Sequence, residues 1–310
     1  MRWRFGFVSV IAALAAMVLG IVWFAQQQPG RVRSGFHKIG QFEIPHARQA
    51  VAVSDAFLFG IDDSAIGQYD KKTGALLGGW KAPADSLIQH LNSGIVIGER
   101  LLAAHSNYPD YPIRNSLESW NSVSLEYAGS QHLSGQYGYA VWVDRFDGSW
   151  WVAFAHYEKT RAKTGVGSES TTLVRFDDDW KKAESWAYPR ALIQRMAPKS
   201  NSGGAWGPDG ILYLTGHDAA EVYAVVAESF KDQLTLLDVF SIDNAGQGIA
   251  WDPSQSDVLF AMKRSGRIVT YSKFEVSWLR RLRWDLIRFL PGSLASPVDS
   301  SPVIDSSSIP

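Results

Sequence analysis

A short unit of two apolar strands separated by a polar turn recurs five times along this 310-residue chain. One clear copy begins at Gly204 with the run Gly-Ala-Trp-Gly-Pro-Asp-Gly-Ile-Leu-Tyr-Leu, and another begins at Gly248 with Gly-Ile-Ala-Trp-Asp-Pro. Weaker copies begin near Val51, Ile95 and Ala140. A repeat of this length is typical of closed or stacked arrays, in which each unit packs on its neighbours.

The spacing of the units matches the size of a propeller blade. Their first strands begin near residues 51, 95, 140, 205 and 249, which gives intervals of 44, 45, 65 and 44 residues. Four strands and their turns need about 40–45 residues in a β-propeller. The last unit lacks a fourth strand, and residues 39–45, before the first unit, have strand character. We therefore expect residues 39–45 to complete the last blade and close the ring, which leaves no open edge.

The predicted fold is an all-β propeller at residues 36–272, expected as a monomer. Five blades are favoured, and six are the alternative if the long interval, which contains residues 188–203, holds another blade. The 13 Trp, 11 Tyr and 15 Phe suit a β-protein, because aromatic side chains pack well on pleated surfaces. Equivalent loops of a ring converge on one axis, so a site is expected at a mouth of the central channel.

The N-terminal 35 residues have a different character. Residues 5–25 form an uncharged run of 21 residues, and a helix over this run is about 31 Å long, close to one hydrocarbon core. The alternative is a cleaved signal peptide, for which the run is long and Trp23 is bulky so close to a cleavage site after Ala25. We expect residues 1–35 to be a membrane anchor and linker, and the propeller to be extracytoplasmic, in the periplasm if the source is bacterial.

Residues 273–291 predict a basic amphipathic helix after the propeller. Its apolar positions recur at helical spacing, at Trp278, Leu282, Leu286 and Phe289. Five basic and two acidic residues lie between residues 273 and 290. The helix either packs on the propeller or lies on an anionic membrane surface. The Ser- and Pro-rich tail at 292–310 is predicted to be disordered.

Polar residues follow the second strand of every unit and precede the first, and both positions should face one mouth of the channel. The residues after the second strands are Asp63, Asn107, His156, His217 and Arg264. The amides before the first strands are Gln49, Asn92, Gln136, Asn201 and Gln247. A long turn after Asn107 adds Tyr108 and Asp110, and loops held by a rigid scaffold often carry function. The alternative is that these residues are polar only because strand ends reach water.

Composition and motifs exclude several classes of function. With 30 basic and 31 acidic residues, overall charge does not favour a nucleic-acid partner. The chain has no cysteine, which excludes disulfides, thiolate metal sites and cysteine nucleophiles. It contains no P-loop, HExxH, GxSxG or glycine-rich nucleotide fingerprint.

The run at residues 204–213 resembles the repeat of β-propellers of the NHL type and of the SMP-30 (gluconolactonase-like) type. The resemblance is clear at residues 204–218 and 248–264. In the SMP-30 group, an asparagine before such a strand and an aspartate after it help bind a divalent metal used in lactone hydrolysis. The resemblance therefore implies metal ligands at Asn201 and at Asp218, or at His217 in place of Asp218, with calcium or zinc as the ion. That group's glutamate ligand has no counterpart near the first strand.

Two functions follow from these observations. The first is a membrane-anchored binding propeller, with a small polar ligand or a partner protein on its loop-rich face. The alternative is a hydrolase or lactonase on the same face, in which a divalent metal activates water. Its catalytic residues are then His156 or His217 as base or ligand and Arg264 as an anion clamp.

Overall fold

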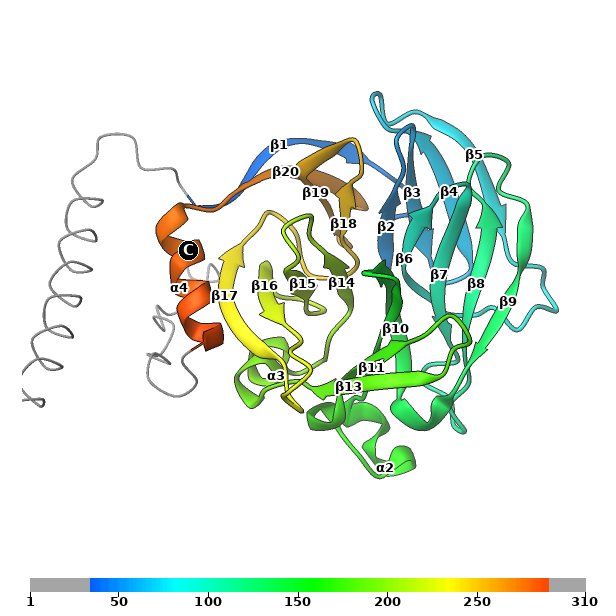
Figure 1. The fold of residues 1–310 in the computed structure, drawn as a ribbon. Helices are drawn as coiled ribbons and strands as arrows, with labels where there is room; N and C mark the ends of the chain where they lie inside the picture. The colour runs from blue at the N-terminus through cyan, green and yellow to red at the C-terminus, as the bar shows by residue number, and fades with distance from the viewer. Residues whose placement is uncertain (1–33, 290–310) are drawn as a thin grey trace, which may run out of the picture. The chain divides into compact units, whose positions relative to one another are not determined.

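The computed structural model describes residues 34–289, and its strands form five four-stranded sheets (Figure 1). Blade 1 contains β2 (Ala50–Val53), β3 (Phe57–Asp62), β4 (Ala65–Asp70) and β5 (Leu76–Lys81). Blade 2 contains β6 (Leu91–Ile97), β7 (Arg100–Ser106), β8 (Asn115–Asn121) and β9 (Tyr127–Leu133). Blade 3 contains β10 (Tyr139–Phe146), β11 (Ser149–Ala155), β12 (Thr172–Phe176) and β13 (Lys182–Ala187). Blade 4 contains β14 (Gly203–Trp206), β15 (Leu212–Thr215), β16 (Glu221–Val226) and β17 (Thr235–Ser241). Blade 5 contains β18 (Ala250–Asp252), β19 (Gln255–Lys263), β20 (Ile268–Glu275) and β1 (Gly35–Glu43).

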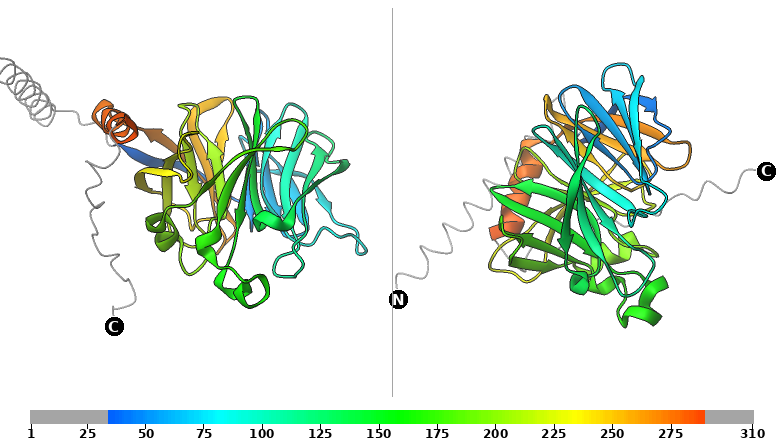
Figure 2. Two further views of the ribbon diagram at one scale, coloured as in Figure 1. Left: turned by 60° about the horizontal axis from the view of Figure 1, so that its bottom comes forward. Right: turned by 90° about the vertical axis from the view of Figure 1, so that its right-hand side faces the viewer.

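The five blades form a closed ring, which confirms the propeller. The innermost strands contact one another in a cycle, from β2 through β6, β10, β14 and β18 back to β2. The segment between β13 and β14, where a sixth blade was considered, holds the helix α3 (Arg190–Met196) and no sheet of its own. The six-bladed alternative is therefore wrong. The connection between β11 and β12 carries η2 (Glu158–Thr160), α2 (Arg161–Thr164) and η3 (Ser168–Ser170). This connection projects beyond the strands of blade 3 (Figure 2).

The N-terminal strand closes the ring, as the sequence predicted. Strand β1 lies beside β20 and supplies the fourth strand of blade 5. The Phe42 and Tyr271 rings stack across this pair with their centroids 5.3 Å apart. A side chain at Gly40 would overlap the Tyr271 ring, so the pair requires glycine there. A buried ion pair from Lys71 Nζ to Asp252 Oδ1, 2.8 Å long, also joins blades 1 and 5.

The hydrophobic core lies between adjacent blades, so both faces of most blades are buried. Between blades 3 and 4, the side chains of Trp142, Trp186, Leu214 and Tyr223 belong to one cluster. Similar clusters fill the other interfaces, such as Phe59 and Trp120 between blades 1 and 2. This two-sided burial explains why the inner strands are continuous apolar runs rather than alternating ones.

The structure corrects the predicted fold class in one respect. Among residues 34–289, no helix is long and apolar enough to cross a membrane. The run at 5–25, on which a transmembrane helix was predicted, lies outside the described residues, as does the tail at 292–310. The described fold is therefore a five-bladed propeller followed by one helix, without the transmembrane helix that the prediction included.

The helix after the propeller, α4, spans Trp278–Phe289. It begins later than predicted, because β20 continues through Lys273 and ends at Glu275. Trp278, Leu282 and Leu286 lie on it at four-residue intervals, and their side chains are exposed.

Candidate functional site

Loops from all five blades line a cavity of about 300 Å³ at one mouth of the channel. We call it the mouth cavity. Seven of its lining residues were predicted from the repeat alignment: Gln49, Asp63, Asn92, Tyr108, His217, Gln247 and Arg264. Of the others, His90 had been considered as a candidate but judged structural, and Tyr157, Lys159, Lys199 and Ser202 were not predicted. His217 and Arg264 also line an adjoining hollow that contains Arg48, Asp218 and Arg267.

On the blade 1 side of the mouth cavity, Asp63 is held by three neighbours. Its Oδ1 lies 2.8 Å from His90 Nδ1 and accepts a 2.5 Å hydrogen bond from Gln49 Nε2. Its Oδ2 lies 3.3 Å from Arg48 Nη1. Burial acts to raise the pKa of Asp63, but the interactions with His90, Gln49 and Arg48 outweigh it, and the pKa lies below its ordinary value. The carboxylate is therefore ionised at neutral pH and already partnered.

On the opposite side of the mouth cavity, the His217 ring lies between Arg264 and Asp218. Arg264 Nη1 lies 3.2 Å from His217 Nε2, and His217 Nδ1 lies 2.5 Å from Asp218 Oδ1. A guanidinium only donates hydrogen bonds, so Nε2 is the acceptor and the proton sits on Nδ1. Burial lowers the pKa of His217 and outweighs the opposing effect of Asp218, which keeps the ring neutral at neutral pH. His217 thus positions the Arg264 guanidinium at the edge of the cavity.

Three cationic side chains around the mouth cavity have no acidic partner. They are Lys159 on η2, Lys199 in the connection between α3 and β14, and Arg264 in the turn between β19 and β20. Within residues 34–289, none of the three forms an ion pair with a carboxylate. Blades 3, 4 and 5 therefore each present one uncompensated positive charge to the same cavity.

Aromatic side chains form the wall of the mouth cavity between blades 2 and 3. The Tyr108 and Tyr157 ring centroids are 4.8 Å apart, and the Tyr108 ring is also 5.7 Å from that of His90. Burial raises the pKa of Tyr108 and of Tyr157. Both hydroxyls consequently stay protonated at neutral pH and can donate hydrogen bonds to a ligand.

Four predicted ligand-binding or catalytic residues lie outside the mouth cavity. Asn107 is buried, and its side chain bonds the Pro112 carbonyl and the Arg114 N–H within its own loop. The Asp110 carbonyl accepts a hydrogen bond from the Tyr139 hydroxyl. The other two residues are Gln136 and His156.

Gln136 is exposed on the 3-10 helix η1 (Gly135–Tyr137). His156 is buried beside Gly138, where a Cβ would come within 2.9 Å of its Nε2. Burial lowers the pKa of His156, and its Nδ1 has no hydrogen-bond partner among the described residues. The structure therefore does not bring His156 together with His217 and Arg264 in one cavity.

The two metal ligands implied by the family resemblance are not arranged as a pair. Asn201 is fully buried, and its side-chain oxygen accepts hydrogen bonds from Trp142 Nε1 (2.6 Å) and the Tyr188 hydroxyl (3.0 Å). Its Nδ2 donates to the carbonyls of Gly203 and Thr215, so the amide is fully engaged. The Asp218 side chain is 64% exposed. In the described part of the chain, no group of three or more His, Asp or Glu side chains is placed to hold a metal ion.

No protein-family description matches this chain, and no curated protein matches it. Among solved structures, the WD40 repeats of RRP9 are 12% identical, covering 73% of this chain and 79% of that chain, with a TM-score of 0.42. U3-55K is 12% identical, covering 73% and 80%, with a TM-score of 0.42. The hydrazine synthase of Kuenenia stuttgartiensis is 11% identical, covering 74% and 84%, with a TM-score of 0.44. Similarities at this level carry no argument about function, and the NHL or SMP-30 type stays a prediction.

Proposed function

We propose that this propeller is a binding protein whose mouth cavity takes a small organic anion, with carboxylate or phosphate groups. The observation that carries the proposal is the set of three unpaired cations, Lys159, Lys199 and Arg264, from three successive blades. Cations that face one cavity without acidic partners attract anions, and charge-assisted hydrogen bonds are among the strongest available to a protein.

The acidic residue of the cavity does not cancel this positive charge. Asp63 is paired with Arg48 at 3.3 Å and hydrogen-bonded to Gln49 and His90. Its charge is therefore compensated within its own group of contacts. The excess of positive charge on the far side of the cavity remains for a ligand.

The uncharged walls suit a small polar molecule. Tyr108 and Tyr157 present aromatic faces and hydroxyl donors, whereas the Asn92 amide nitrogen already donates to the Ala140 carbonyl at 2.9 Å. A volume of about 300 Å³ lies at the lower end of the range for ligand pockets, which favours a small molecule over a peptide.

The same geometry supports binding better than hydrolysis. The Nε2 of His217 is occupied by Arg264, so it is not free to take a proton from water. His156 does not line the cavity, and the Asn201 amide is consumed by the protein itself. Neither of the histidines predicted to act as base, His156 and His217, is therefore placed to do so in this cavity.

Calorimetry on the full chain would test the proposal with citrate and inorganic phosphate as the anions and glucose as the neutral comparison. We expect at least one anion to bind, glucose not to bind, and affinity to fall as salt is raised. The variants Lys159→Gln and Lys199→Gln should each weaken binding about tenfold, which corresponds to about 1.4 kcal/mol per charged contact.

Lys72→Gln is the matched control, because Lys72 lies in the turn between β4 and β5, at the other end of blade 1 from the Asp63 turn. It should bind the anion as the wild type does. The proposal fails if neither anion binds, or if the mouth-cavity variants bind as tightly as the Lys72→Gln control.

A further inference from the structure

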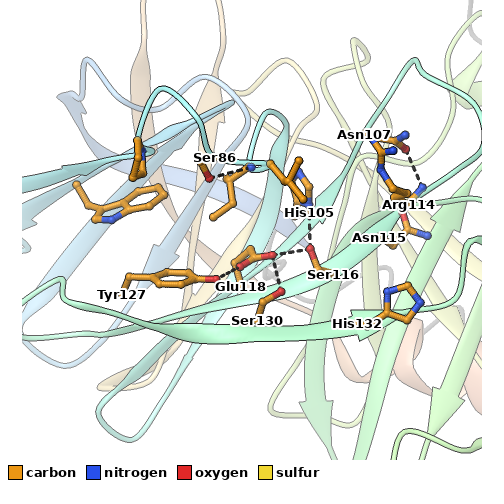
Figure 3. Close-up of a pocket in the computed structure, with 14 residues that line it drawn as sticks. Ser86, His105, Asn107, Arg114, Asn115, Ser116, Glu118, Tyr127, Ser130 and His132 are labelled. Carbon is orange, nitrogen blue, oxygen red and sulfur yellow. Dashed lines mark hydrogen bonds between the residues drawn. The ribbon is translucent and has the colours of Figure 1, made fainter.

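A second and larger cavity, of about 510 Å³, lies between blades 1 and 2 and shares no lining residue with the mouth cavity. We call it the inter-blade cavity. On one side it is bounded by Trp80 of β5 and by the connection that contains Pro83, Leu87 and Ile88. On the other side it is bounded by polar side chains of β7, β8 and β9 (Figure 3).

The register of blade 2 places these polar side chains on one face. Ser116 and Glu118 are two residues apart on β8, so their side chains point the same way. Ser116 lies opposite His105 of β7, and Glu118 lies opposite Ser130 of β9. A row of hydrogen-bonding groups therefore runs across the three strands and faces the cavity.

The row has a defined direction of donation. The Gln89 N–H donates to His105 Nε2, so a neutral His105 carries its proton on Nδ1, which lies 2.9 Å from Ser116 Oγ. Burial lowers the pKa of His105 to about 4, which keeps the ring neutral at neutral pH. Ser116 Oγ then donates to Glu118 Oε1 at 2.5 Å.

Glu118 is the final acceptor in this row of hydrogen bonds, and no positively charged side chain of the described chain pairs with it. Ser130 Oγ also donates to its Oε1 at 2.8 Å, and the Tyr127 hydroxyl donates to its Oε2 at 2.6 Å. All three donors are neutral, and three donated bonds suit an ionised, acceptor-only carboxylate. The residue is 3% exposed, and within residues 34–289 it forms no ion pair. A buried carboxylate without a counter-ion is costly, so a cation is the expected occupant.

Aromatic rings complete the surroundings that a cation prefers. The Trp80 and Tyr127 rings are nearly parallel, at 19°, with their centroids 6.2 Å apart. Aromatic faces attract ammonium groups, and the neighbouring Leu87 and Ile88 offer apolar contact to the rest of a ligand. Arg114, the cationic residue of the lining, lies with Asn107 at the opposite end of the cavity from Tyr127 (Figure 3).

We infer that the inter-blade cavity is a second binding site, which takes a small organic ammonium ion with an apolar body. The ammonium group pairs with Glu118 beside the Trp80 and Tyr127 rings, and the apolar body lies against Leu87 and Ile88. This site is separate in place and in charge preference from the mouth cavity.

Calorimetry on the full chain with phenethylammonium would test this inference, with 2-phenylethanol as the neutral comparison of similar shape. We expect the ammonium ion to bind at least about tenfold more tightly than the alcohol. Glu118→Gln keeps the side-chain shape and removes the charge, so it should weaken binding of the ammonium ion about tenfold or more and leave the alcohol unchanged.

Trp80→Leu, at a half-buried position, is the second variant and should also weaken ammonium binding. It provides the test if Glu118→Gln does not fold. Lys72→Gln, in the exposed turn between β4 and β5 and outside the lining of both cavities, is the control and should bind the ammonium ion as the wild type does. The inference is overturned if the ion does not bind at millimolar concentration, if the alcohol binds equally well, or if the folded variants bind the ion as tightly as the wild type.

Discussion

Asn201 offers the sharpest test of how this ring is held together, because its amide joins two blades. It precedes β14 of blade 4, and it accepts hydrogen bonds from Trp142 of β10 and from Tyr188, which follows β13. Asn201→Ala removes the acceptor for both donors. It also removes the donor to the carbonyls of Gly203 and Thr215.

The expected loss of stability follows from the groups left without partners. Trp142 and Tyr188 are both buried, so neither donor can turn to water. Each unsatisfied buried donor costs about 1–3 kcal/mol, so we expect about 2–6 kcal/mol in total. The Thr215 carbonyl adds little, since it still accepts from the Ser202 N–H. For a domain of this size, such a loss lowers the melting temperature by about 4–24 °C.

Urea denaturation followed by tryptophan fluorescence measures this difference. The control is Gln136→Ala, which removes an exposed amide and should change stability by less than about 0.5 kcal/mol. A loss below about 1 kcal/mol for Asn201→Ala would refute the assignment of a structural role. Asn201→Asp separates this role from metal binding: the carboxylate cannot donate to the two carbonyls, so we expect destabilisation that added calcium or zinc does not reverse.

Two further predictions concern buried charges. Lys71→Met should lower the free energy of unfolding, measured by urea denaturation, by about 3–5 kcal/mol, because it leaves Asp252 buried without its cation. A double variant that also carries Asp252→Leu should recover most of this loss. Equal stability of the single and double variants would contradict the prediction. Burial raises the pKa of Asp144 to about 7 from an ordinary 3.8, against hydrogen bonds from the Trp206 and Arg145 N–H groups. The folded protein therefore binds this proton more tightly than the unfolded chain, so the free energy of unfolding should fall between about pH 4 and pH 7, relative to Asp144→Asn; parallel pH profiles of the two proteins would count against it.

The repeat predicted the ring because its residues serve the same packing in each blade. Gly204 lies against the Trp142 ring, and a side chain there would overlap the indole. This contact explains a glycine at the start of an apolar strand. The closing strand was also predictable from the sequence. The last unit lacked a fourth strand, and residues 39–45, before the first unit, had strand character without a unit of their own. The later start of α4 was not, because β20 pairs with β19 as far as Lys273, opposite Val258, and local helical spacing does not reveal this register.

The candidate site was predicted most fully where the residue lies next to a strand of the repeat, as at Gln49, Asp63 and Arg264. Asp63, His217 and Arg264 lie in the short turns that directly follow β3, β15 and β19, so their position in the repeat places them at the mouth. Asn107 begins a long loop and turns inward to hold it. Lys159 and Lys199 lie in long connections, whose paths the repeat does not determine.

The contacts that close the ring also reach the mouth cavity. The Ile44 N–H donates to the Arg267 carbonyl, and the Arg267 guanidinium donates to the Pro45 carbonyl and lies 3.3 Å from Asp62 Oδ2. Arg48 in turn lies 3.7 Å from Asp62 Oδ1 and 3.3 Å from Asp63 Oδ2. The segment that follows β1 therefore links the closing blade to the acidic side of the mouth. Loosening the closure should disturb the position of Asp63 before the remaining blades separate, because each blade packs only on its two neighbours.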